Sequence, residues 1–374
     1  MIQFDVGEKL PEREGKELKL LHKKIKVLGI GGAGCNIVSR IYSRDWSYVD
    51  FLVCDSSMRT LSECQDVEKM LMGDSLTHGW GTGGDKEIAR KVAQEAESKI
   101  KDVLRGADLI FVVCSLGKGL GTGASPVFFK IAREIGILSI GFFVLPFSFE
   151  GKESAANSQE ALNSLWQLVD GALVVPNDVL LSIEKAQSEN SSLREVFSKI
   201  DAVFENLLQS VESVLFQPAV MGIDFADIKS FLIKGKKLMI TTGEGTGEGC
   251  VEEAIEKIFY SSAWGEISLD KTKGALLIIK AGEAFKLTEL EKIILSLQKR
   301  AALPIPITFG VYTDKELSDK LIITLMTCSA DTQQIEPGKL DTLYQQELKL
   351  KTYDEKDLDV PTFLRKNIKV NNEE

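Results

Sequence analysis

The sequence predicts a two-domain α/β protein, in which a parallel sheet covered by helices on both faces is followed by a long helix and a mixed α/β domain. The chain has 374 residues, whereas one domain commonly takes about 100–200. Strand-like apolar runs alternate with helical stretches over the first half, which is typical of parallel sheets. One long amphipathic stretch then precedes a second set of strands and helices.

Five short β-rich runs are expected to form the parallel sheet of the first domain. They are residues 25–28, 49–54, 109–114, 137–145 and 171–175. Helices are expected between them, for example at residues 85–105 and 153–168. Glycines follow several of these strands, and in such sheets ligands bind beyond the carboxyl ends of the strands. The first domain is therefore expected to be built around a ligand.

The clearest helix is predicted at residues 192–215, where apolar residues recur at spacings of three and four. Ser192 and Glu195 form a capping box at its start, and Pro218 stands just past its end. Its apolar side chains, Phe197 among them, are expected to face the core along the whole helix.

A mixed α/β domain is predicted after this helix. The expected strands are residues 237–242, 275–280, 307–312 and 321–327, with helices at 251–260 and 287–300. Residues 331–356 are polar with little periodicity, which favours a linker. The expected division is an extension (1–23), a first domain (24–190), the central helix (191–216), a second domain (217–330), the linker and a tail (357–374).

Composition excludes several classes of function. A formal charge of −10 argues against nucleic-acid binding through a general basic surface. The six cysteines are scattered without a C-x-x-C pair, so reduced thiols are expected rather than zinc or disulfides. Residues 1–24 are charged rather than apolar, and the longest apolar stretch, 137–147, is short of the ~20 residues that span a bilayer. A cytoplasmic protein without direct membrane insertion is expected.

Three glycine loops are the strongest functional signal. Residues 29–34, 79–84 and 117–123 each lead into a predicted helix, and such loops let the backbone approach an anion at a helix N-terminus. The first loop alone also fits a dinucleotide-binding motif, with Asp50 or Asp55 as the ribose acid. Tight turns are the plain structural alternative. Three loops exceed the need of one dinucleotide, no residue set for hydride transfer is found, and no G-x-x-x-x-G-K-[ST] is present.

These loops resemble those of the tubulin/FtsZ family of cell-division GTPases. Residues 117–126 are similar to its signature loop, and residues 29–36, 76–85, 146–151 and 176–178 resemble its other nucleotide loops in the same order, so that the resemblance covers residues 24–330. It implies the family's fold: a Rossmann-like parallel-sheet GTP-binding domain and a mixed-sheet α/β domain joined by a long central helix. It also implies GTP or GDP as ligand, with Mg²⁺, whose protein ligands are not identified.

The resemblance implies a set of nucleotide-binding residues. Those expected at the phosphates are Gly31, Gly32, Ala33, Asn36, Gly83, Gly84, Gly117, Lys118, Gly119, Leu120, Gly121, Thr122 and Gly123. Glu150 is expected to face the ribose, with Ser154 nearby, and Asn177, Phe197 and Asp201 to recognise guanine. A carboxylate and an amide can pair with the guanine edge, and a ring can stack on it. For Phe197 core packing is the alternative, and for Asn177 a turn after Pro176.

Residues 221–227 resemble the family's catalytic loop, which implies that Asp224 and Asp227 polarise the attacking water in the nucleotide site of the next subunit. Hydrolysis would then require head-to-tail self-assembly into filaments of the cytokinetic ring at the division site. A solvated acidic turn is the structural alternative.

Several positions depart from the family pattern. Lys118 and Leu120 replace small residues, Ser154 stands at an arginine position and Gly222 at an asparagine position. Residues 55–57 also differ from the family's Asn-Thr-Asp. These departures leave open a degenerate relative that binds nucleotide and co-assembles or regulates with little hydrolysis.

The tail resembles the family's C-terminal peptide. Asp359, Pro361, Phe363 and Leu364 are its expected partner-binding residues, followed by basic residues. The resemblance implies membrane-tethering division proteins similar to FtsA or ZipA as partners. A frayed tail is the alternative.

Overall fold

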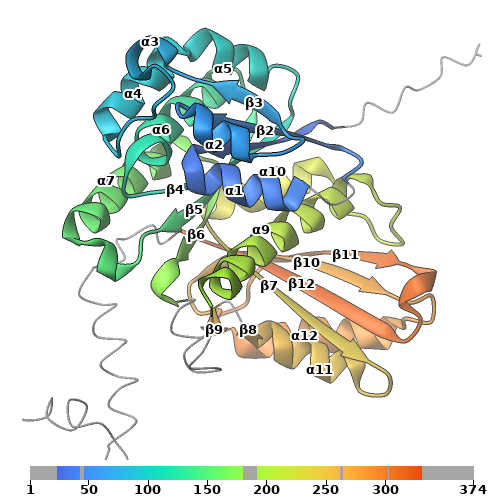
Figure 1. Ribbon diagram of the computed structural model, residues 1–374. Helices are drawn as coiled ribbons and strands as arrows, with labels where there is room; N and C mark the ends of the chain where they lie inside the picture. The colour runs from blue at the N-terminus through green and yellow to red at the C-terminus, as the bar shows by residue number, and fades with distance from the viewer. Residues whose placement is uncertain (1–22, 43–45, 180–191, 262–263, 302, 331–374) are drawn as a thin grey trace, which may run out of the picture.

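A single ten-stranded sheet runs through the whole described molecule (Figure 1). The computed structural model describes residues 23–42, 46–179, 192–261, 264–301 and 303–330. The strand order is β11-β10-β12-β7-β6-β5-β4-β1-β2-β3. Its two halves correspond to the parallel and mixed regions that the sequence predicts.

The first half is entirely parallel, as expected. Its strands are β1 (Ile25–Ile30), β2 (Val49–Asp55), β3 (Glu68–Leu71), β4 (Leu109–Ser115), β5 (Leu138–Leu145) and β6 (Gly171–Pro176). β1 lies in the centre, where Ile25 is in register with Val49 on one side and with Leu109 on the other. Parallel pairing brings the carboxyl ends of β1, β2 and β4 to one edge of the sheet.

Helices cover both faces of this half. One face packs against α4 (Lys86–Glu95), α5 (Glu97–Leu104), α6 (Gly119–Glu134) and α7 (Lys152–Leu168), and the other against α1 (Gly31–Tyr42) and α9 (Leu193–Phe216). The helix α10 (Phe225–Lys234) contacts β10 and β12 of the other half. The short α2 (Met58–Glu63), α3 (Asp74–Thr77) and η1 (Ser148–Glu150) lie in connections. The single helix expected at 85–105 is two helices that meet at Ala96.

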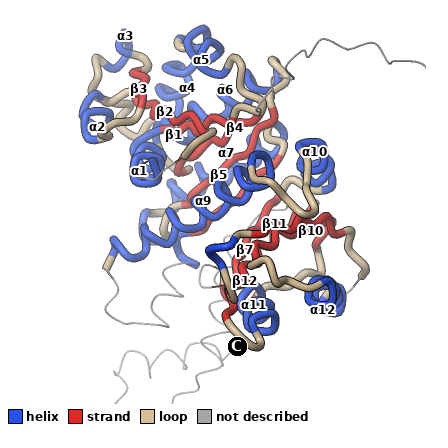
Figure 2. Tube along the Cα trace, turned by 90° about the vertical axis from the view of Figure 1, so that its right-hand side faces the viewer, coloured by secondary structure: helices blue, strands red, loops and turns tan. Residues whose placement is uncertain are grey.

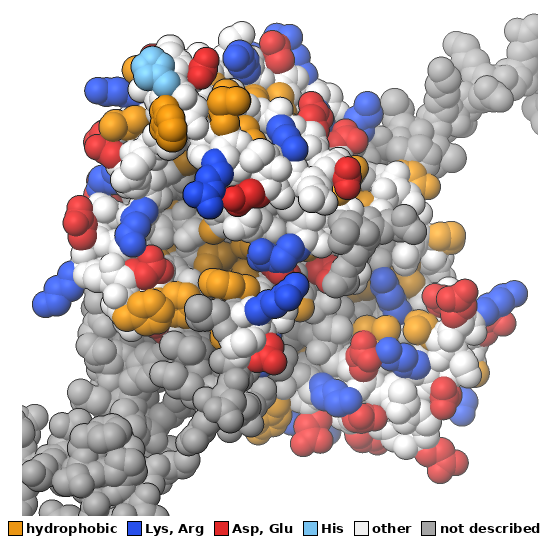
Figure 3. Space-filling model, viewed as in Figure 1, with side chains coloured by type: hydrophobic (Ala, Val, Ile, Leu, Met, Phe, Trp, Pro, Cys, Tyr) orange, Lys and Arg blue, Asp and Glu red, His pale blue; other side chains and the backbone are white. Residues whose placement is uncertain are grey.

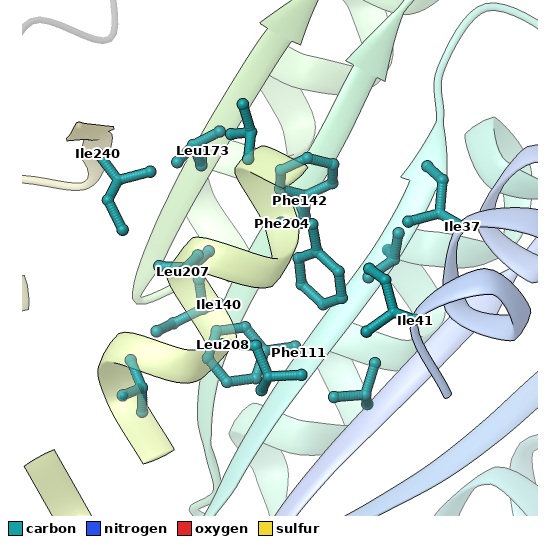
Figure 4. Close-up of a cluster of buried hydrophobic side chains, with 14 of the residues drawn as sticks. Ile37, Ile41, Phe111, Ile140, Phe142, Leu173, Phe204, Leu207, Leu208 and Ile240 are labelled. Atoms are coloured by element: carbon teal, nitrogen blue, oxygen red, sulfur yellow. The ribbon is translucent and has the colours of Figure 1, made fainter. Parts of the chain in front are cut away.

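The long helix α9 fills the groove between the two halves. Its predicted capping box is present: Ser192 Oγ accepts the N–H of Glu195 at 3.3 Å, and Glu195 Oε2 accepts that of Ser192 at 2.6 Å. Figure 4 shows Phe204, Leu207 and Leu208 among apolar side chains of the sheet and of α1. The Phe204 ring is 4.9 Å from that of Phe142. This packing anchors α9 on the sheet and on α1.

The prediction that Phe197 faces the core is wrong, since 40% of its surface is exposed. The neighbouring Val196 takes the buried position, and successive residues point about 100° apart around a helix.

The second half is a mixed sheet, as predicted. Its strands are β7 (Lys237–Thr246), β10 (Thr272–Ala281), β11 (Ile307–Thr313) and β12 (Lys320–Ser329). β10 is parallel to β11, while β12 is antiparallel to both of its neighbours. Two helices, α11 (Cys250–Phe259) and α12 (Leu287–Arg300), cover one face, as Figure 2 shows. The small elements β8 (Tyr260–Ser261), β9 (Gly265–Glu266) and η2 (Lys315–Leu317) complete it.

The seam between the halves is narrow. β6 and β7 pair only at Ala172 with Lys237 and at Leu173 with Leu238.

Acidic and basic side chains are interspersed on the face that Figure 3 shows. Of the helices in the described ranges, none combines the length and the apolar character needed to cross a bilayer.

Three local predictions need correction. α1 begins at Gly31 and α6 at Gly119, inside the glycine loops that were expected to precede these helices, because the glycines form the first helical turns. Pro126 consequently lies inside α6. The helix α10, directly after Asp224, was not anticipated.

Candidate functional site

A cavity of about 350 Å³ lies at the carboxyl ends of β1, β2 and β4. Segments from all three predicted glycine loops meet around it. The predicted residues that line it are Gly31, Gly32, Ala33, Gly83, Gly84, Lys118, Gly119, Leu120, Gly121, Glu150 and Ser154. Loops up to about ninety residues apart in the sequence thus converge on one site, because parallel strands end at a common edge.

Glycine is required where α6 approaches the sheet. A Cβ on Gly121 would lie 2.2 Å from the carbonyl oxygen of Ser115, at the end of β4. Gly119 has φ +51° and Gly31 has φ +73°, a conformation that side chains disfavour. Both residues begin helices whose first N–H groups have no partner within the helix. Of these, the N–H of Gly119 itself donates to the carbonyl of Gly84 at 2.8 Å. Such backbone groups favour an anion at this edge.

Two buried hydroxyl groups in the cavity have no hydrogen-bond partner among the described residues. Ser56 and Ser154 are 1% and 2% exposed, both line the cavity, and both Oγ atoms are unpaired. An unpaired buried polar group costs roughly 1–3 kcal/mol. The cavity is therefore suited to a ligand that can accept or donate hydrogen bonds there.

The charges of the cavity are few. Asp55 is 5% exposed, and burial raises the pKa of its carboxyl, although the backbone N–H groups of Ser57 and Ser56 oppose the shift. Lys118 Nζ lies 3.2 Å from Glu150 Oε2, and Glu150 Oε1 accepts the N–H of Phe147 at 3.0 Å. Within the described chain no group of three or more His, Cys, Asp or Glu side chains converges.

Three predicted residues of the loop 117–123, namely Gly117, Thr122 and Gly123, do not line the cavity but stabilise the conformation of the loop. The N–H of Gly117 donates to Thr122 Oγ1 at 2.8 Å, and that hydroxyl donates to the carbonyl of Lys118 at 3.1 Å. A Cβ on Gly123 would lie 2.1 Å from the carbonyl oxygen of Lys86. Thr122 thus fixes the loop, and Gly123 allows α6 to pack against α4.

The three residues expected at guanine, Asn177, Phe197 and Asp201, lie outside the cavity lining. Asn36, which is expected at the phosphates, also lies outside it. The Oδ1 atom of Asn177 is buried without a partner, as a site for a ligand would leave it. Phe197 is exposed, so core packing does not account for it. The four residues remain predictions.

Arg40 is a residue of this region that the sequence did not reveal. Its guanidinium donates to both carboxylate oxygens of Asp201, at 2.5 and 2.8 Å. The signal that could have found it is its position one helical turn after Asn36 on α1. Other lining residues were also missed, namely Ile30, Thr60, Thr82, Ser115 and Leu116.

Asp224 and Asp227 cap the start of α10. Asp224 Oδ1 accepts the N–H of Asp227 at 2.8 Å, and Asp227 Oδ2 accepts that of Asp224 at 2.9 Å. This capping box uses one oxygen of each carboxylate, and it gives the pair a more specific structural role than the solvated acidic turn that was the alternative to catalysis. The second oxygen of each takes no part in the box.

The capped end of α10 lies near the amino ends of β1 and β4, whereas the cavity lies at their carboxyl ends. The Phe225 ring is 5.0 Å from Lys23 Nζ, and Lys23 pairs with Asp108 just before β4. Ile30 and Ser115, at the other ends of β1 and β4, line the cavity. A six-residue strand such as β1 spans about 15–20 Å. The two carboxylates therefore cannot act in the cavity of their own molecule.

The predicted tail residues lie outside the described residues.

Comparisons with known proteins agree with this architecture. Residues 24–185 match the model of the tubulin/FtsZ family GTPase domain, and residues 236–331 match that of the FtsZ family C-terminal domain. The chain is 28% identical over 323 residues to the cell division protein FtsZ of Coxiella burnetii, covering 86% of this chain and 81% of that protein.

Solved structures lead to the same family. The FtsZ dimer of M. jannaschii superposes with a TM-score of 0.72 at 29% identity, covering 83% of this chain and 89% of that one. CetZ2 of Haloferax volcanii, at 19% identity and a TM-score of 0.71, shares the fold over 87% of this chain and 99% of its own. Both matched domains occur in the family's order around α9. The chain thus belongs to the tubulin/FtsZ family of cytoskeletal GTPases, as a divergent FtsZ-like member.

Proposed function

We propose that this protein binds and hydrolyses GTP and assembles head to tail into protofilaments of the bacterial cytokinetic ring. The observation that carries the proposal is the convergence of three glycine loops and two unpaired buried hydroxyls, Ser56 and Ser154, on one cavity. Backbone N–H groups at the starts of α1 and α6 would hold the phosphates. Asn177, Phe197 and Asp201 would recognise guanine, with Arg40 orienting Asp201.

Assembly supplies the rest of the active site. Since Asp224 and Asp227 lie at the far edge of the sheet, stacking a second copy on the cavity edge would bring its two carboxylates to the phosphates of the first. Their oxygens outside the capping box would orient and polarise the attacking water, while the loop amides stabilise the charge on the phosphoryl oxygens.

The site also fits Mg²⁺, which binds through one or two carboxylates and the phosphates of a nucleotide. Asp55 lines the cavity at the end of β2 and would be the protein ligand, with the Ser56 hydroxyl beside it. The ion would neutralise phosphate charge.

A second candidate is a relative that binds nucleotide and co-assembles with little hydrolysis. The capping box favours it, because helix capping is by itself a sufficient reason for Asp224 and Asp227 to be present. Ser154 in place of an arginine points the same way, since a hydroxyl carries no charge to the phosphates.

One assay separates the two candidates. The full chain is incubated with GTP and Mg²⁺ while light scattering and phosphate release are followed together. We expect scattering to rise above a critical protein concentration and phosphate release to begin at the same concentration. Assembly without phosphate release would favour the second candidate, and absence of both would exclude the first.

The tail is proposed to recruit the filament to the membrane through division proteins similar to FtsA or ZipA. Deleting residues 357–374 is expected to leave GTP-dependent assembly unchanged, because the deleted residues follow the folded domains. Localisation of a fluorescent fusion to the division site is expected to be lost. A truncated fusion that still reaches the division site would contradict this role.

A further inference from the structure

One positively charged side chain lines the cavity in the part of the chain that the structure describes. Among the described residues that line it, Lys118 is the one cation, while Asp55 and Glu150 are acidic. A nucleoside di- or triphosphate would add several negative charges to this site. Placing phosphates next to carboxylates costs Coulomb energy unless a cation lies close by. The position of Lys118 therefore decides how the cavity accepts an anion.

Lys118 is tied to Glu150 in the structure. Its Nζ lies 3.2 Å from Glu150 Oε2, and the side chains are 58% and 31% exposed. Glu150 is held from the other side, because its Oε1 accepts the N–H of Phe147. Lys118 has an extended backbone immediately before the first residue of α6, and its flexible stem carries three rotatable donors. Glu150 is thus the fixed member of the pair and Lys118 the movable one.

A second feature beside Lys118 points to a ligand. Ser154 Oγ is buried and unpaired, and it lies against the residue preceding Lys118, since a Cβ on Gly117 would be 2.4 Å from it. The hydroxyl and the ammonium are both donors, and both residues line the cavity. Two donors beside the start of a helix match the oxygens of a phosphate chain.

We propose that Lys118 is the built-in counter-ion of the cavity: it pairs with Glu150 when the cavity is empty and moves to the polyphosphate when a nucleotide binds. Its departure frees one carboxylate oxygen of Glu150, which then accepts a hydrogen bond from a sugar hydroxyl of the same ligand. The inference rests on the proposed nucleotide site and deepens it. In this mechanism, binding of the polyphosphate by Lys118 releases the carboxylate of Glu150 for the sugar.

The mechanism predicts effects of opposite sign at the two residues. Removing the charge of Lys118 takes a donor from the phosphates. Removing the charge of Glu150 takes away the group that competes with the phosphates for Lys118. For a ligand without a sugar, such as inorganic tripolyphosphate, K118Q should therefore bind more weakly than the wild type and E150Q more tightly.

The test is calorimetric titration of the full-length protein with GDP and with tripolyphosphate, in EDTA so that no divalent cation shares the charge. K118Q is expected to weaken GDP binding roughly 10- to 100-fold, the range for a charge-assisted hydrogen bond. E150Q is expected to strengthen tripolyphosphate binding roughly two- to five-fold, the range for an exposed ion pair. In the double variant K118Q/E150Q that gain should disappear.

Lys152 provides the matched control, because it is an exposed lysine two residues after Glu150 that does not line the cavity. K152Q should bind GDP as the wild type does, and K118A, a second variant at the first site, should behave as K118Q does. GDP affinity of K118Q and K118A equal to that of a binding-competent wild type would overturn the inference alone, as would an E150Q variant that binds tripolyphosphate no better. A wild-type protein that binds neither GDP nor GTP would overturn the proposed function itself.

Discussion

Replacing Asp224 or Asp227 by alanine is expected to lower GTP turnover by roughly 10²–10⁴-fold, the range for lost acid–base assistance, while GTP affinity stays unchanged. The affinity should persist because the carboxylates lie at the opposite edge of the sheet from the cavity of their own molecule. Phosphate release measures turnover at a protein concentration where the variant still assembles, and nucleotide titration measures the affinity.

Asparagine at the same position separates catalysis from helix capping. Asp224 is the N-cap of α10, and asparagine caps a helix about as well as aspartate does. D224N should therefore keep the stability of the wild type and still lose turnover, whereas D224A should also lose about 1 kcal/mol of unfolding free energy. Full turnover in D224N would remove the catalytic assignment and leave only the cap.

A mixing experiment tests whether the site is shared between molecules. Gly32 lines the cavity and has no atom within 4 Å of a built Cβ, so G32D should fold and place a negative charge where phosphate is expected. G32D alone should not turn over GTP. Mixed with D224A it should recover part of the activity, since the intact acids of one variant then meet the intact cavity of the other. No recovery at any ratio would argue against a shared site.

The second large effect is expected at Phe204, where F204A should lower the free energy of unfolding by about 3–5 kcal/mol. Phe204 is fully buried, and its ring contacts those of Phe111 and Phe142 at centroid distances of 6.1 and 4.9 Å. The deletion leaves a cavity where α9 meets the first half of the sheet. Urea denaturation of the nucleotide-free protein measures the loss, and a change below about 1 kcal/mol would show that Phe204 does not hold α9 in place.

Phe197 on the same helix gives the matched comparison. Because 40% of its surface is exposed, F197A should change the unfolding free energy by less than about 0.5 kcal/mol. If its ring stacks on guanine, GTP affinity should fall roughly two- to ten-fold, the worth of an aromatic contact. Unaltered GTP affinity in F197A would remove Phe197 from the nucleotide site.

The sequence predicted the sheet and the loops well because these features depend on local patterns. Buried parallel strands are continuous apolar runs, and β4 and β5 were placed to within one residue at each end. The helix starts at Gly31 and Gly119 were placed too late, since glycine disfavours a helix interior and only the close approach to the sheet explains its presence there.

Features that depend on distant residues escaped prediction. Arg40 and Asp201 are 161 positions apart, so no local pattern announces their ion pair. The exposure of Phe197 follows from how α9 lies on the sheet, which its periodicity does not specify. The spacing of three between Asp224 and Asp227 is compatible with a capping box, but spacing alone does not distinguish a helix cap from the acidic turn of a catalytic loop.

The two residue pairs that join β6 to β7 have a mechanical consequence. Backbone hydrogen bonds contribute about 0.5–1.5 kcal/mol each, so this short ladder alone resists a hinge motion of the halves by only a few kcal/mol. The remaining stiffness must come from the apolar side chains of α9 and α10, which belong to a core that includes Leu173 of β6 and Met326 of β12. Side-chain packing of these helices, more than strand pairing, thus sets the orientation of the first half of the sheet relative to the mixed half.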